Sequence, residues 1–141
     1  MINDQILYLS NVYPKKTLIS YKNSHYSIGL INKRINSIAG FCLEQKIEDQ
    51  YIGIKIDHPI NLLCSIIAIN RINKIPVIFS NDTIKNNSTK IKVFLDDKNI
   101  IFDCMSLKIK EKKYFENNVQ VVLFTTGTTG KPKLVELTYS N

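Results

Sequence analysis

The sequence predicts an α/β fold, with a mixed, largely parallel sheet and flanking helices. Three observations support this prediction. Residues 27–43 repeat apolar side chains with the period of a helix, residues 51–79 read as strand, helix and strand, and residues 121–137 place two apolar strands around a loop rich in Gly and Thr. The chain has 141 residues, of which 44% are hydrophobic and 22% charged. That length and composition suit one globular domain with a core.

The first elements are a strand and a capped helix. Residues 16–21 alternate in strand fashion, residues 22–24 form a turn, and residues 25–26 lead into a helix. Ser27 is the expected N-cap, because its hydroxyl can accept a hydrogen bond from the first helical turn. Helical spacing then gives one apolar stripe, made of Ile31, Ile35, Ile38, Ala39, Cys42 and Leu43.

A βαβ unit follows the polar connection at residues 46–50. Residues 51–56 form its first strand, and Pro59 suits the first position of a helix, where its missing N–H is tolerated. The helix carries apolar residues on more than one face, which indicates burial against a sheet, and Arg71 and Lys74 stand at its end, where cations are favourable. Residues 75–79 form the second strand. Such a unit predicts parallel strands joined by a right-handed connection.

The stretch between this unit and the terminal loop predicts less regular structure. Residues 81–90 are polar, and residues 91–95 and 100–102 are expected to be short strands around a turn at residues 96–99. Residues 108–118 are charged and lack apolar periodicity, which predicts a mobile connection.

The loop Thr125-Thr126-Gly127-Thr128-Thr129-Gly130-Lys131-Pro132-Lys133 is the main functional signal. Its two glycines let backbone N–H groups converge on an anion, and its threonines and lysines add donors and positive charge. It differs from a P-loop, because a threonine replaces the first glycine and a proline follows the first lysine. Residues 134–138 read as a strand, so the loop joins two strands. A simple hairpin with a glycine-rich turn is the alternative interpretation.

The order of apolar strand, T-T-G-T-T-G-K-P-K, apolar strand and Thr138-Tyr139-Ser140-Asn141 resembles the phosphate-binding signature of the AMP-forming, adenylate-forming ligases. That superfamily includes acyl-CoA synthetases and nonribosomal-peptide adenylation domains. The order of elements from residue 16 onward also matches its N-terminal region. Tyr139 resembles the aromatic residue that o-succinylbenzoate–CoA ligases often carry where T-H-x-N is common, and a packing tyrosine is the alternative.

The resemblance implies ATP, with Mg²⁺ as its counter-ion, as cofactor, and a carboxylic acid as substrate. The acid would form an acyl-adenylate with release of pyrophosphate, and then a thioester with CoA or a carrier-protein thiol. Binding of the ATP phosphates is implied for Thr125, Thr126, Gly127, Thr128, Thr129, Gly130 and Lys133. Lys133 is also the catalytic candidate, because it would stabilise charge on the departing pyrophosphate. Lys131 is as readily a solvated lysine, and Pro132 is structural.

The resemblance also implies that residues 1–141 are an incomplete N-terminal AMP-binding domain that ends just after the phosphate loop 125–133. In relatives the adenine loop, the ribose-binding aspartate and the C-terminal domain lie downstream. Residues 134–138 would then end at a sheet edge. We therefore expect an N-terminal fragment of a ligase that is inactive by itself. The alternative is a truncated non-catalytic nucleotide-binding module or an inactive relic.

Other function classes have weaker support. The net charge of +7 invites a nucleic-acid interpretation, but Arg34 and Arg71 are the only arginines and the lysines are scattered. The three cysteines have no metal-ligand spacing, and no apolar run approaches the ~20 residues of a membrane span. A cytoplasmic protein without a metal site fits best. The remaining polar candidates read as packing or turn residues: His25, His58, Glu48-Asp49 and Asp96-Asp97.

Overall fold

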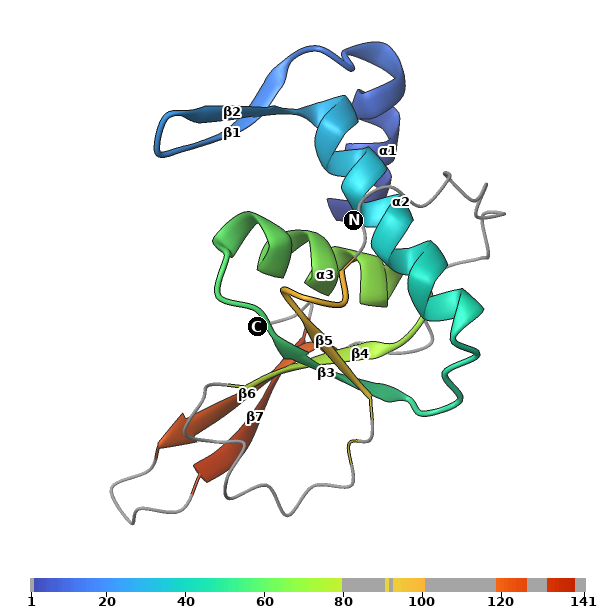
Figure 1. Cartoon of the computed structure of the whole chain (residues 1–141), viewed down its shortest axis with the longest axis vertical. Helices are drawn as coiled ribbons and strands as arrows, with labels where there is room; N and C mark the ends of the chain where they lie inside the picture. The colour runs from blue at the N-terminus through green and yellow to red at the C-terminus, as the bar shows by residue number, and fades with distance from the viewer. Residues whose placement is uncertain (1, 80–90, 92, 101–118, 127–131, 139–141) are drawn as a thin grey trace.

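The computed structural model describes residues 2–79, 91, 93–100, 119–126 and 132–138 (Figure 1). Its elements occur in the order α1 (Ile2–Val12), β1 (Thr17–Tyr21), β2 (Ser24–Ser27), α2 (Ile28–Glu44), β3 (Tyr51–Lys55), α3 (Pro59–Arg71), β4 (Ile75–Ile78), β5 (Phe94–Asp96), β6 (Val119–Thr126) and β7 (Pro132–Thr138). The predicted α/β class is confirmed.

The main sheet has five strands in the order β5-β3-β4-β6-β7. β3 pairs in parallel with both β4 and β5, and β4 pairs in parallel with β6. β7 lies at the edge and is antiparallel to β6, so the sheet is mixed, as predicted. The adjacent, parallel β3 and β4 joined through α3 confirm the predicted βαβ unit. β1 and β2 form a separate antiparallel hairpin, at the end of the molecule opposite to β6 and β7 (Figure 1).

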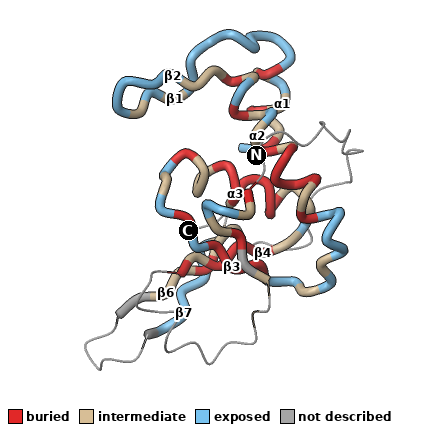
Figure 2. The backbone as a smooth tube through the Cα atoms, viewed as in Figure 1, coloured by how far each residue is buried: buried red, intermediate tan, exposed pale blue. Residues whose placement is uncertain are grey.

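The sheet carries apolar side chains on both faces. Alternation along β3 directs Ile52 and Ile54 toward the core that contains α2 and α3. The register of β3 on β4 then places Val77 on the opposite face, where it packs with Val122 of β6. The buried residues concentrate in α2, α3, β3 and β4, whereas the residues of the β1–β2 hairpin are largely exposed (Figure 2). The helices thus cover one face of the sheet, and a smaller apolar cluster lies on the other.

The capped helix is confirmed as α2. The backbone N–H of Leu30 donates to Ser27 Oγ at 3.2 Å, so Ser27 is the N-cap. Five of the six residues in the predicted apolar stripe are buried, and Leu43 is the exception, with 49% exposure. Leu43 is one residue from the end of α2 and at the margin of the stripe, which explains why that part of the prediction is wrong. Residues 25–26 belong to β2 and not to a helix entrance.

The buried helix is confirmed as α3. Pro59 is its first residue, and His58 occupies the N-cap position without a side-chain capping bond. Its buried positions run around the helix, as predicted: Ile60, Cys64, Ser65, Ile67, Ala68, Ile69 and Asn70. Within the described residues, no helix is both long and apolar enough to cross a bilayer.

The strands expected around residues 96–99 are only partly correct. β5 comprises residues 94–96 and excludes Ile91 and Val93, and the buried Ile100 is not in a strand. The Asp96 carboxylate accepts the N–H groups of Lys98 and Asn99, each at 2.8 Å, and this side-chain turn ends the strand. The expectations for residues 81–90, 101–102 and 108–118 lie outside the described residues.

α1 is a helix that the sequence analysis did not predict. Its buried residues are Asn3, Ile6 and Ser10, so two of the three are polar. Ser10 Oγ accepts from Asn32 Nδ2 of α2 at 2.9 Å, and Asn3 Oδ1 accepts from Arg71 Nε at 3.3 Å. A helix that packs through polar groups gives a weak apolar stripe, which explains why periodicity did not reveal it.

Two cysteines are free, buried thiols in the helical core. Burial raises the pKa of the Cys42 thiol to about 12, against a lowering effect of a backbone hydrogen bond. Burial also raises the pKa of the Cys64 thiol to about 11, against the positive charge of Arg34. Both thiols are therefore neutral at physiological pH.

These raised pKa values predict a loss of stability at alkaline pH. An unfolded thiol ionises near pH ~8.5, whereas the folded thiols hold their protons until pH about 11 or 12. The contribution of the two buried thiols to the free energy of unfolding is complete below pH ~8.5. It falls as the pH rises toward their folded pKa values. We expect the urea midpoint to fall over this range, with a smaller fall in a Cys42→Ala/Cys64→Ala variant. If the urea midpoints of the two proteins fell equally steeply with pH, this expectation would be contradicted.

Candidate functional site

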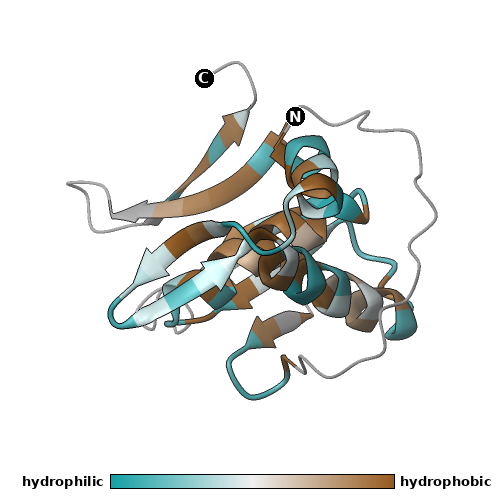
Figure 3. Ribbon diagram, turned by 90° about the horizontal axis from the view of Figure 1, so that it is seen from above, coloured by the Kyte–Doolittle hydropathy of each residue, from teal (hydrophilic) through white to brown (hydrophobic). Residues whose placement is uncertain are grey.

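The candidate phosphate loop is held by the β6–β7 hairpin. The register pairs Thr125 with Lys133 and Thr126 with Pro132, so the antiparallel strands close on both ends of the loop. The prediction that the loop joins two strands is confirmed. β6 is hydrophobic over most of its length (Figure 3), and Val122 is buried. The strand thereby anchors the loop to the body of the sheet.

The predicted site residues are described only in part. Thr125 and Thr126 are the last two residues of β6, and Lys133 is an exposed residue of β7. Alternation places Lys133 on the same face of the sheet as Val135, opposite to Glu136. Gly127, Thr128, Thr129 and Gly130 lie outside the described residues, as do Lys131 and Tyr139. Their proposed roles stay predictions.

An aromatic pair lies just before the loop. The ring centroids of Phe79 and Phe124 are 4.7 Å apart, and the rings are tilted by 43°. Phe79 also continues the pairing of β4, because its N–H donates to the carbonyl of Ile54 at 2.9 Å. These contacts fix the end of β6 against its neighbours, so the start of the loop rests on packed structure.

The carboxyl ends of four parallel strands meet at the sheet edge where the loop emerges. This edge is where open α/β sheets bind ligands. After β3 come Asp57 and His58, and after β5 comes Asp97. The Asp97 carboxylate accepts the N–H of Asp57 at 3.0 Å and lies 3.5 Å from Asn61 Nδ2. β4 lies between β3 and β6, so the ends of β3 and β6 are about 10 Å apart.

The polar candidates divide between this edge and other places. His58 packs edge-on against Tyr21, with ring centroids 5.5 Å apart, which confirms a packing role. His25 Nδ1 hydrogen-bonds to Ser20 Oγ at 2.8 Å in the exposed β1–β2 hairpin, far along the chain from the loop. Glu48-Asp49 precede β3 and therefore lie toward the opposite edge. Among the described residues, no three His, Cys, Asp or Glu side chains group to hold a metal ion.

Sequence analysis missed two residues of this edge, Arg34 and Asn61. Arg34 Nη1 donates to Asn61 Oδ1 at 3.3 Å, and the guanidinium lies 5.0 Å from the ring centre of Tyr26. Arg34 thus links α2 and β2 to the start of α3. The position of Asn61, in the first helical turn after a strand, was the one signal that could have revealed it.

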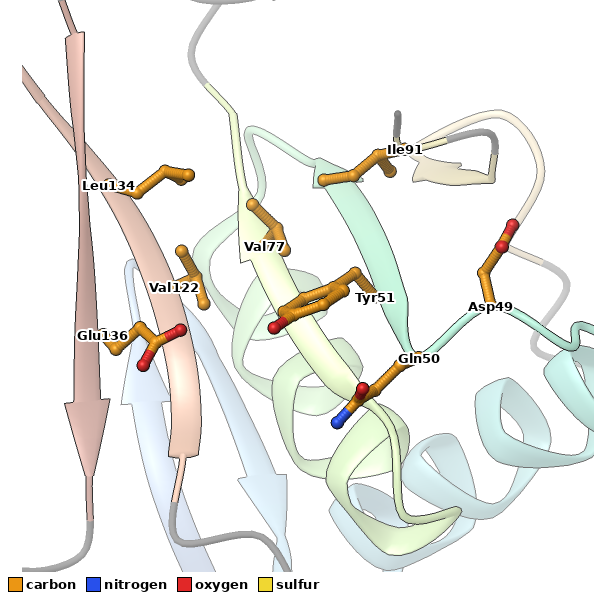
Figure 4. Close-up of a pocket in the computed structure, with 8 residues that line it drawn as sticks. All are labelled: Asp49, Gln50, Tyr51, Val77, Ile91, Val122, Leu134 and Glu136. Atoms are coloured by element: carbon orange, nitrogen blue, oxygen red, sulfur yellow. The ribbon is translucent and has the colours of Figure 1, made fainter. Parts of the chain in front are cut away.

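A hollow of about 440 Å³ lies on the sheet face away from α2 and α3 (Figure 4). Its apolar lining includes Tyr51, Val77, Val122 and Leu134, with Glu136 and Gln50 among the polar members. Lys133 projects to the other face of β7. The described part of the hollow is therefore separate from the candidate phosphate contacts of Lys133.

Comparison with known proteins shows what this architecture is similar to. No protein-family model matches the chain. The chain is 27% identical over 138 residues to VraA of Staphylococcus epidermidis, provisionally named a long chain fatty acid-CoA ligase, and the match covers 94% of this chain and 30% of that protein. The N-terminal subdomain of Klebsiella oxytoca NpsA, in complex with 3-hydroxybenzoyl-AMSN, matches with a TM-score of 0.77 and 15% identity, covering 98% of this chain and 41% of that chain.

A second solved structure gives the same result. O-succinylbenzoate Coenzyme A synthetase (MenE) of Bacillus subtilis, in complex with AMP, matches with a TM-score of 0.73 and 13% identity, covering 95% of this chain and 42% of that chain. The chain therefore has the fold of the N-terminal subdomain of adenylate-forming ligases, and the resemblance seen in the sequence is confirmed. The chain spans about 30% of the length of the curated relative.

Proposed function

We propose that the chain supplies the ATP-phosphate-binding part of an adenylate-forming carboxylic-acid ligase. The observation that carries the proposal is the β6–β7 hairpin, which holds the Gly/Thr loop at the carboxyl edge of the sheet and keeps Lys133 exposed beside it. The sequence likeness to VraA and the AMP and AMSN complexes of the structural neighbours support the same class. In this proposal residues 1–141 are the first part of the AMP-binding domain.

The reaction places its main electrostatic demand on the phosphates. A substrate carboxylate oxygen attacks the α-phosphorus of ATP, the bond to the bridging oxygen breaks, and pyrophosphate leaves with the electron pair. Amide and hydroxyl donors of residues 125–130, together with the ammonium group of Lys133, would stabilise the growing charge on the leaving group. Mg²⁺ would enter as the counter-ion of ATP. A thiol of CoA or of a carrier protein would then attack the acyl carbon and release AMP.

Titration of the chain with Mg-ATP, followed by calorimetry and by amide chemical shifts, tests the binding step. Inorganic tripolyphosphate should compete with ATP, and adenosine should not, because the proposed contacts are with phosphates. We expect dissociation constants near or below the millimolar range, which corresponds to about 4 kcal/mol of binding free energy. Equal binding of adenosine, or failure of ATP to bind a longer protein that contains this chain, would overturn the assignment of the loop.

Pyrophosphate exchange, and not the titration, separates this proposal from the alternative of a non-catalytic nucleotide-binding module. Such a module would bind Mg-ATP but would not exchange pyrophosphate into ATP when it is part of the longer protein and a carboxylic acid is supplied. A ligase would perform this exchange.

The free thiols of Cys42 and Cys64 support the proposal that the protein works in a reducing compartment such as the cytoplasm.

A further inference from the structure

The outer side of α1 and the turn that follows it expose an unusual set of apolar residues. Tyr8 is 65% exposed, Val12 45% and Tyr13 55%. Tyr8 and Val12 are four residues apart and share one side of the helix. The opposite side is buried through Asn3, Ile6 and Ser10. α1 therefore packs on the protein through polar groups as well as Ile6, and its outer side presents Tyr8 and Val12 to solvent beside the polar Gln5 and Asn11.

Positive charge lies next to this apolar side, at Lys15 and Lys16. Residues 1–43 contain Lys15, Lys16, Lys22, Lys33 and Arg34, whereas Asp4 is their single acidic residue. Lys15 and Lys16 directly follow Tyr13, and Lys16 Nζ lies 5.9 Å from the centre of the Tyr13 ring. An aromatic ring and a lysine thus occupy the same local surface. This first third of the chain carries a charge of +4 out of a total of +7.

We propose that α1 and the turn at residues 13–16 form a docking surface for an anionic lipid bilayer. Transfer of an apolar side chain out of water is favourable, and a bilayer offers an apolar phase beneath negative headgroups. Tyrosine suits that boundary, because its ring enters the apolar layer while its hydroxyl stays hydrated. An RNA partner would match the lysines but offer no apolar phase for Val12 and Tyr8.

The placement of α1 permits this contact without distorting the fold. The backbone N–H of Gly29 donates to the carbonyl of Pro14 at 2.9 Å, and that of Ile28 donates to the carbonyl of Lys16 at 2.9 Å. These bonds fasten the turn to the start of α2, so the apolar side is presented by a fixed scaffold. The surface lies toward the end of the molecule opposite to the β6–β7 hairpin (Figure 1). A docked molecule would keep the candidate phosphate loop away from the membrane.

Sedimentation with lipid vesicles tests the proposal independently of nucleotide binding. The chain should sediment with vesicles of phosphatidylcholine and phosphatidylglycerol, and much less with phosphatidylcholine alone. Lys15→Gln/Lys16→Gln should weaken this binding about fivefold for each lysine at low salt, and added salt should weaken it further. Tyr8→Ser/Val12→Ser should weaken it about tenfold or more, because both residues lose their apolar contact.

A matched variant on another surface provides the control. Leu43→Ser/Lys46→Asn removes one exposed apolar residue and one exposed lysine at the far end of α2, and Asn suits the positive φ of 49° at Lys46. It should bind vesicles like the unchanged chain, and circular dichroism should show all variants folded. Unchanged binding by the Tyr8/Val12 variant, self-association that this variant abolishes, or preferential binding of RNA would each overturn the proposal.

Discussion

Replacing Lys133 with alanine is expected to weaken Mg-ATP binding about 10- to 100-fold. A hydrogen bond to a charged group contributes about 1.5–3 kcal/mol. Lys133 is in the first part of β7, directly after the loop, and it pairs in register with Thr125. The loss should also be seen for tripolyphosphate, whereas adenosine should bind neither the unchanged chain nor the variant. Calorimetric titration with Mg-ATP and with tripolyphosphate measures this loss of affinity. A longer protein that contains this chain should show a parallel loss of pyrophosphate exchange.

Lys131→Ala is the matched control for this prediction. It removes the same charge two residues earlier, at a position that the resemblance does not implicate in phosphate binding, so its effect should be several-fold smaller. Lys133→Arg should restore part of the binding, because the guanidinium keeps the charge but not the compact shape of an ammonium. If Lys131→Ala and Lys133→Ala weaken binding equally, the lysines act only as general positive charge and Lys133 has no particular role.

The hairpin and the βαβ unit could be predicted because local patterns decide them. The loop residues between two apolar runs allow few structures other than a connection between strands, and the structure pairs those strands from residue 119 to residue 138. The helix at 28–44 was predictable for the same reason, since Ser27 and the buried isoleucines agree on its start and its face. Where capping, periodicity and turn chemistry coincide, sequence is sufficient.

Residues whose environment depends on distant partners could not be predicted. The buried side of α1 is polar because Arg71 and Asn32, far along the chain, supply its partners. The role of Asp97 likewise depends on the N–H of Asp57, which is forty residues earlier. Neither pairing leaves a local pattern. The candidate site was therefore predictable at the loop, through its motif, and not at the neighbouring strand ends.

Replacing Arg71 with methionine is the second large expected effect, on stability. Arg71 Nη1 donates to Asn32 Oδ1 at 3.0 Å and also to Asn36 Oδ1, and Nε donates to Asn3 Oδ1. Methionine keeps the length of the side chain but leaves these three amide oxygens without their donor. We expect a loss of about 3 kcal/mol in the free energy of unfolding, a large share of the ~5–15 kcal/mol of an ordinary domain.

The same change should loosen α1 before the rest of the molecule. Arg71 reaches α1 through Asn3 and α2 through Asn32 and Asn36, and Asn32 Nδ2 continues the network to Ser10 of α1. Urea unfolding should report the global loss, and amide hydrogen exchange should report faster opening of residues 2–12 than of α3. Lys33→Met, at an exposed position of α2, should change stability by about 0.5 kcal/mol at most. Equal stability of the two variants would show that α1 is held by its apolar contacts, such as Ile6, and not by this polar network.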